Sequence, residues 1–207
     1  MFRRSVVSIF IFLNLIVFVA WHFYISDEFQ ASFMINNFLV SWKGLEEGRV
    51  WTLLTSVFSH SGLMHFLLNM FVLNNFGPIL ESVLGTKNFI KFYVGAGIFS
   101  SFCHVLVSAF LLNKPDLPAL GASGAISGLV MVFSLLFPKQ KLLLFGIIPV
   151  SAIFGALIFV GLDIWGLIAQ AEGGGLPIGH GAHLGGALSG FVYYKFILKP
   201  RLSGQSE

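Results

Sequence analysis

A serine set among glycines, in the stretch GASGAISG at 121–128, is the most reactive arrangement in the chain. A serine hydroxyl becomes a nucleophile when a neighbouring base removes its proton, and acyl transfer also needs hydrogen-bond donors for the oxyanion. Ser123 begins an apolar stretch, where the free N–H groups and the positive end of a helix would stabilise negative charge. The same glycines are typical of close helix packing in membranes, so this stretch alone predicts either catalysis or packing.

A histidine in a second glycine-rich stretch favours catalysis. His183 lies in GAHLGGALSG, and Gly186 and Gly190 follow it at i+3 and i+7 on one helix face. A glycine face lets two helix backbones approach closely. We therefore expect this helix to pack on the one that carries Ser123, and to bring the imidazole within reach of the hydroxyl, as a general base must be.

Two more polar residues, His65 and Asn69, are four apart in HSGLMHFLLN and so share one helix face. Their side-chain N–H groups, together with the backbone N–H of Ser123, would serve as an oxyanion hole. The alternative is a zinc or copper site at the outer face. Its candidate ligands would be His60, His65, His180 and His183.

Two observations disfavour that metal site. The chain has no HExxH motif, and apart from Asp163 no acidic residue accompanies these histidines within the apolar stretches. We predict neither a metal nor a cofactor. For Asp163 we expect a local cap or ion pair, and a charge-relay role is the alternative that would require it to reach His183. His104, with Ser100 and Ser101 nearby, is expected to pack, the alternative being that this patch holds water for hydrolysis.

The composition places these residues in a membrane. Of 207 residues, 56% are hydrophobic and 10% are charged, and the mean hydropathy is +0.87. A soluble domain of this size would carry more charge. We therefore predict an all-α membrane protein, a single domain over residues 1–207 with six transmembrane helices of about 20 residues each. The predicted spans are about 5–24, 61–80, 88–112, 121–137, 142–164 and 181–198.

The distribution of positive charge predicts how these spans are oriented. In the six-span arrangement, nine of the twelve Lys and Arg residues lie on the side of the N-terminus. Because positive charge favours the cytoplasmic side, both termini are expected there, and the polar starts of the second, fourth and sixth spans share the outer layer. The net charge of +3 then indicates contact with the lipid bilayer rather than with nucleic acid. The mixed aromatic and charged loop 25–60 predicts short helices at the outer interface.

Taken in order, HSGLMHFLLN, GASGAISGL and GAHLGGALSG resemble the motifs of the rhomboid family of intramembrane serine proteases. The resemblance extends from about residue 45 and includes RVWTLLTSVFSH at 49–60 and GPILESVLG at 77–85. It implies a rhomboid-like six-helix bundle with a Ser–His dyad, in which Ser123 is the nucleophile and His183 the base. It also implies an oxyanion site formed by His65, Asn69 and the Ser123 amide.

The chain departs from the family pattern at two positions. Ser127 stands where the best-known bacterial members have a tyrosine whose ring packs on the catalytic histidine, so what orients His183 is not predicted. Thr52 follows Trp51 where the family often has Trp-Arg, which concerns the first outer loop. The nucleophile and the base are both present.

We predict an intramembrane serine endopeptidase that cleaves transmembrane segments of single-span membrane proteins. One alternative is a non-cleaving rhomboid-like protein that binds membrane clients, which would predict that the serine or the histidine is missing. Another is a channel or transporter, which would predict polar residues continuing through mid-depth. The short ends, without a transit peptide or soluble domain, predict a bacterial inner (plasma) membrane with both termini cytoplasmic. The substrate, its cleavage site and the oligomeric state are not predicted.

Overall fold

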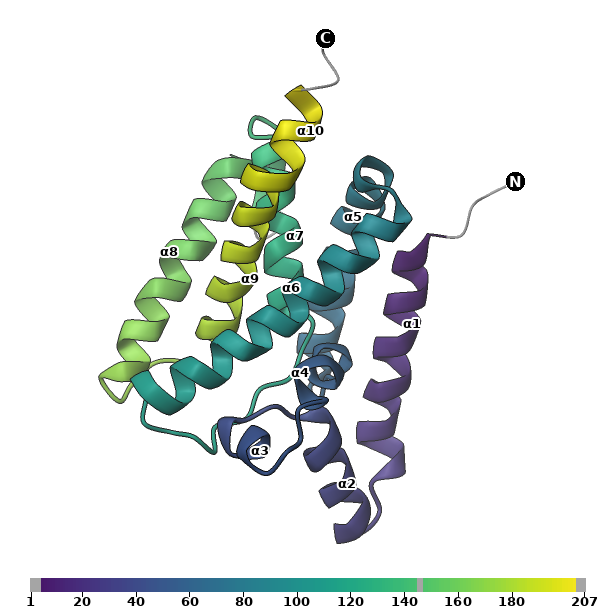
Figure 1. Ribbon diagram of the computed structural model, residues 1–207, viewed down its shortest axis with the longest axis vertical. Coiled ribbons are helices and arrows are strands. Elements are labelled where there is room, and N and C mark those ends of the chain that lie inside the picture. The colour runs from purple at the N-terminus through teal and green to yellow at the C-terminus, as the bar shows by residue number, and fades with distance from the viewer. Residues whose placement is uncertain (1–4, 145–146, 204–207) are drawn as a thin grey trace.

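The computed structural model describes residues 5–144 and 147–203, and it is mostly helical (Figure 1). Within these residues, four continuous helices are long and apolar enough to cross a membrane. They are α1 (Val6–Val19) continued by η1 (Ala20–Tyr24), α5 (Leu63–Leu84), α6 (Thr86–Leu106) continued by η3 (Val107–Leu111), and α8 (Ala152–Ala171).

The fourth and sixth predicted spans are not among these four helices. α7 (Ser123–Leu136) has 14 residues, about 21 Å of helix against a hydrocarbon thickness of about 30 Å. α9 (His180–Tyr193) continues through η4 (Tyr194–Leu198) into α10 (Lys199–Ser203). The mostly helical membrane fold is confirmed, whereas helix length alone establishes four spans rather than six.

The fifth predicted span, 142–164, is placed too early in the sequence. Strands β1 (Lys141–Leu144) and β2 (Ile148–Ser151) form an antiparallel hairpin before α8 begins at Ala152. Pro149 explains the difference, because proline in a helix interior removes a hydrogen bond and clashes with the preceding turn. The fold is therefore not purely α. Residues 145–146 of the predicted span lie outside the described part of the chain.

Short helices fill the loop 25–60, as the sequence predicts. They are α2 (Glu28–Phe38), α3 (Trp42–Glu46), α4 (Thr52–Thr55) and the 3-10 turn η2 (Ser56–Phe58). The side chains of Asp27 and Ser41 accept hydrogen bonds from the backbone N–H groups of Gln30 and Gly44, which starts the first two helices. Their position at the membrane interface remains a prediction.

Helix α7 packs against α5, α6, α8 and α9 and so forms the centre of the bundle (Figure 1). Its contact with α9 is made of glycines. A methyl group at Gly186 would overlap the carbonyl oxygen of Gly124, and one at Gly190 would overlap that of Gly128. The two backbones are thus in direct contact, which confirms the packing expected from the two glycine-rich stretches.

Candidate active site

Ser123 is the first residue of α7 and follows a sharp turn at Gly121. The φ angle of Gly121 is +124°, a region that side-chain-bearing residues rarely adopt. A methyl group at this position would also lie 2.6 Å from Cε1 of His65. Gly121 is therefore required by its backbone conformation and by the close approach of the His65 ring.

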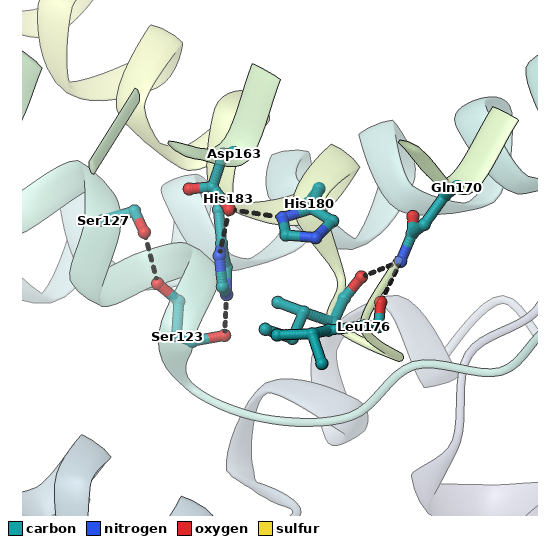
Figure 2. A network of polar contacts seen from close by, with 8 residues as sticks. Ser123, Ser127, Asp163, Gln170, Leu176, His180 and His183 are labelled. Atoms are coloured by element: carbon teal, nitrogen blue, oxygen red, sulfur yellow. Dashed lines mark hydrogen bonds and ion pairs between the residues drawn. The ribbon is translucent and has the colours of Figure 1, made fainter. Parts of the chain in front are cut away.

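The direct contact between α7 and α9 brings the two sequence-predicted catalytic side chains together. Nε2 of His183, in the first turn of α9, lies 2.8 Å from Oγ of Ser123 (Figure 2). That distance is within the range a general base requires. His183 is only partly buried, so a substrate can approach the pair.

Asp163 of α8 lies on the other side of the same imidazole (Figure 2). Its Oδ1 accepts a hydrogen bond from Nδ1 of His183 at 3.0 Å, and a second one from Nδ1 of His180 at 2.7 Å. Because a carboxylate only accepts, Nδ1 of His183 must carry the proton, and Nε2 is then free to accept from Ser123. The structure thus brings Asp163 to His183, the condition that the charge-relay alternative requires.

Ser127 does not contact His183. Its Oγ donates to the backbone carbonyl of Ser123 at 2.8 Å, one helical turn earlier (Figure 2). The residue that orients His183 is Asp163, on a different helix, and not the residue at position 127. A carboxylate inside an apolar span was the signal in the sequence, since such residues are costly in a membrane and usually functional.

His65 and Asn69 line the same cavity as Ser123 and His183. Nδ2 of Asn69 donates to the backbone carbonyl of His65 at 2.8 Å, which uses one of its two N–H groups. The ring of His65 meets the edge of the His60 ring, with 4.8 Å between the centroids. The structure therefore places both predicted oxyanion residues beside the nucleophile, and their role remains a prediction.

His60 holds the segment that precedes the nucleophile. Its Nε2 accepts from the backbone N–H of Ala122 at 3.4 Å, and its side chain is fully buried. Burial lowers the pKa of His60 from 6.5 to about 3, with a smaller contribution from the nearby His65. His60 is consequently neutral at physiological pH.

The histidines of the alternative metal site form two separate pairs. His60 lies beside His65, whereas His180 and His183 share Asp163. In the described part of the chain, only the second pair forms part of a group of three potential metal ligands. In the sequence, His180 is a candidate only within the four-histidine set, and no pattern there links it with Asp163.

The cavity has a volume of about 1070 Å³ and is mostly apolar. Leu68, Phe71, Val72 and Phe76 of α5 line it on one side, and Gly155, Phe159 and Val160 of α8 line it on another. The loop segments 117–121 and 177–179 also border it. Ser100, Ser101 and His104 add the polar patch noted in the sequence. An apolar cavity with a few convergent polar groups is typical of a ligand or substrate site.

Comparison with known protein families supports the motif-based resemblance. A family model described as "Rhomboid domain" matches residues 47–200. RHOMBOID-like protein 12, mitochondrial, of Arabidopsis thaliana is 32% identical over 210 residues, which cover 96% of this chain and 60% of that protein. Rhomboid protein 1, mitochondrial, of Saccharomyces cerevisiae is 36% identical over 72% of this chain and 42% of its own length. Presenilin-associated rhomboid-like protein A, mitochondrial, of Danio rerio is 31% identical over 92% of this chain and 47% of its own length.

These names contradict the predicted location. The three relatives are mitochondrial, and a further relative from Arabidopsis thaliana, 30% identical over 73% of this chain, is chloroplastic. The prediction of a bacterial inner membrane with cytoplasmic termini is therefore wrong, and the relatives point to an organelle. The match spans about half of each of the first three relatives, so their complete activities are not carried over by similarity alone.

Proposed function

The chain belongs to the rhomboid family, and from that premise we propose that it is an intramembrane serine endopeptidase. The observation that carries the proposal is the continuous chain of hydrogen bonds from Ser123 through His183 to Asp163 (Figure 2). A non-cleaving client-binding protein would have no use for a nucleophile and a base in contact. The same contact argues against a channel or transporter.

In the proposed reaction, Oγ of Ser123 attacks the carbonyl carbon of the scissile bond while its proton passes to Nε2 of His183. The proton then moves to the leaving amine, and water releases the acyl group by the reverse sequence. Asp163 is a positioning residue, because it holds the imidazole in the required tautomer and stabilises the imidazolium that forms. Its hydrogen bonds go to His180 and His183, not to the nucleophile.

We assign the oxyanion site to His65, Asn69 and the backbone N–H of Ser123. As the first residue of α7, Ser123 has an N–H that no preceding helical turn satisfies. Asn69 retains one amide N–H after its bond to the His65 carbonyl. Each such donor typically contributes about 10²–10³-fold to the rate of acyl transfer.

The apolar lining of the cavity fits a segment of a membrane-spanning substrate. Its walls on α5 and α8 offer hydrocarbon surface, and its polar groups gather around Ser123. We propose that single-span membrane proteins enter it from the bilayer of an organellar inner membrane. We further propose six crossings, with α7 and the continuous helix α9–η4–α10 as the fourth and sixth.

The deciding experiment is proteolysis by the purified protein in liposomes with a labelled single-span substrate. The wild type should cleave, whereas Ser123→Ala and His183→Ala should lose at least about 10³-fold in rate. A fluorophosphonate should label the wild type but not Ser123→Ala. The matched control is Ser134→Ala on the same helix, where a buried serine has no hydrogen-bond partner among the described residues. Equal cleavage by all variants, or an unlabelled wild type, would refute the proposed function.

A further inference from the structure

Three potential ligands converge behind the imidazole of His183. His180 and His183 lie three residues apart in the first turn of α9, and Asp163 faces them from α8 (Figure 2). One ligand atom from each residue lies within 4.8 Å of the other two. Two imidazoles and one carboxylate, with a fourth position open, make a donor set that zinc commonly binds in proteins.

We propose that Asp163, His180 and His183 bind a divalent transition-metal ion, preferentially zinc, and that the bound ion inhibits the peptidase. Binding follows from the geometry alone, whereas inhibition rests on the proposed function. The ion is a regulator in this scheme and takes no part in the reaction.

The distances fit such an ion after a small expansion. Zinc binds imidazole nitrogen at about 2.0–2.1 Å and carboxylate oxygen at about 2.0–2.2 Å, so tetrahedral ligand atoms lie about 3.3 Å apart. Oδ1 of Asp163 now lies 2.7 Å from Nδ1 of His180 and 3.0 Å from Nδ1 of His183. These two distances would open by a few tenths of an ångström, and the two histidine nitrogens, within 4.8 Å of each other, would have to settle at the same spacing. Two nitrogen ligands also favour zinc, copper or nickel over magnesium.

His180 is fixed in place by its packing. Its ring packs flat against Gly166 of α8, where any methyl group would overlap Nε2, and this holds Nδ1 toward Asp163. Nε2 itself is buried and has no hydrogen-bond partner among the described residues. Nδ1, which faces Asp163, is the nitrogen of His180 that can bind a metal.

The cavity gives the ion a route to this cluster. Asp163 and His183 both line it, and their side chains are 14% and 21% exposed. His180 lies deeper, with a side chain that is 7% exposed. An ion arriving through the cavity would meet the carboxylate and His183 first and His180 last.

Inhibition follows from the tautomer that the metal imposes. A metal on Nδ1 of His183 forces the ring proton onto Nε2. Nε2 would then donate to Oγ of Ser123 and could no longer take its proton. Asp163, engaged with the ion, would no longer orient the ring. Loss of a general base lowers the rate by about 10²–10⁴-fold, and removal of the metal by a chelator should restore it.

Binding is tested first in Ser123→Ala, so that the result does not depend on catalysis. Co²⁺ added to this variant in detergent should produce visible absorption of a tetrahedral site, and Zn²⁺ should abolish it, while Mg²⁺ should have no effect. Adding His180→Asn or His183→Asn should weaken binding at least about tenfold. Gel filtration of each variant checks that it is folded. The absence of Co²⁺ and Zn²⁺ binding in folded Ser123→Ala would overturn the proposal.

Inhibition is tested by proteolysis with and without Zn²⁺, each variant being compared with itself without metal. The wild type should lose activity and regain it with EDTA, whereas His180→Asn should be far less sensitive. Controls are His22→Asn, at an exposed histidine of η1, and Cys103→Ala, the single thiol, which should stay as sensitive as the wild type. Equal sensitivity of His180→Asn and the wild type would overturn the regulatory proposal. Metal binding by a wild type that never cleaves would support the site and refute the proposed function.

Discussion

Asp163 reaches His183 through a single hydrogen bond of 3.0 Å, and that bond determines which ring nitrogen faces Ser123. In Asp163→Asn the amide can donate as well as accept. The imidazole can then adopt the tautomer in which Nε2 donates to the serine. A comparable change in serine proteases lowers kcat about 10⁴-fold. We expect a large fall in kcat of at least about 10²-fold here, with KM nearly unchanged.

The test separates positioning from folding. Both kcat and KM are measured in liposomes, and the rate of fluorophosphonate labelling is followed for wild type and variant. Gln170→Ala serves as a control on the same helix, because its side chain bonds only loop carbonyls, those of Leu176 and Ile178. A variant with unchanged kcat, or one in which only KM rises, would show that Asp163 does not position the base.

His60 should make the stability of the protein depend on pH. Its pKa is about 3 in the folded protein and near 6.5 when unfolded. Between these values the unfolded state binds more protons, so the free energy of unfolding falls as the pH drops below 6.5. From pH 7 to pH 5 we expect a loss of about 2 kcal/mol from this residue.

His60→Gln tests this expectation, because glutamine keeps an acceptor for the Ala122 N–H and does not titrate. Thermal unfolding in detergent is compared at pH 7 and pH 5. The wild type should lose more stability than His60→Gln over this interval. An identical pH dependence of the two proteins would contradict a buried neutral His60.

The pairing of Ser123 with His183 could be predicted from sequence, whereas that of Asp163 with His183 could not. Both α7, which carries Ser123, and α9, which carries His183, have a face of glycines. Two such faces predict that the helices pack against each other. The glycines of α8 on either side of Asp163, Gly161 and Gly166, are five residues apart and so lack the spacing of three or four that predicts a shared packing face. The rotation and depth of α8 depend on where it begins, and the hairpin shifts that point to Ala152.

At the scale of elements, the contact between α7 and α9 determines the distance between nucleophile and base. The overlap that a methyl group at Gly186 would make is with backbone of α7, which cannot rotate away as a side chain can. In Gly186→Ala the helices must separate, at a cost of about 1–3 kcal/mol or more. We expect a lower unfolding temperature together with loss of proteolysis and of fluorophosphonate labelling.

Gly161→Ala is the matched control, because a methyl group there would meet nothing within 4 Å. Alanine favours a helix interior over glycine by about 0.5–1 kcal/mol, so this variant should be as stable as the wild type or more so. Both variants are compared by thermal unfolding and labelling. Wild-type behaviour of Gly186→Ala would mean that α7 and α9 are not in direct backbone contact.

For the whole molecule, the number of membrane crossings decides whether α7 and α9, the helices that carry Ser123 and His183, run through the bilayer. Apolar length identifies α1, α5, α6 and α8, because each offers about the 20 residues that a bilayer requires. It does not settle α7, which is apolar but has only 14 residues. The start of α1 and the end of α10 lie at the same end of the bundle (Figure 1), as an even number of crossings requires.

Two exposed loop residues distinguish six crossings from four. If α7 and α9 both cross, Lys139 lies on the same side as Lys87, and Glu172 on the same side as Asp27. If α7 and α9 do not cross, the chain stays on one side between α6 and α8, and both assignments are exchanged. All four residues are exposed, so each accepts a cysteine without disturbing the core.

We expect the six-crossing pattern. Single cysteines replace these four residues in a Cys103→Ala background, which removes the single native thiol. Vesicles of known orientation are treated with a membrane-impermeant maleimide, before and after permeabilisation with detergent. Cysteines at 27 and 172 should react from one side and those at 87 and 139 from the other. If the cysteine at 139 reacted together with that at 27, α7 would not cross the membrane. Ser123 would then begin a helix that does not span the bilayer, which contradicts the proposed cleavage within the membrane.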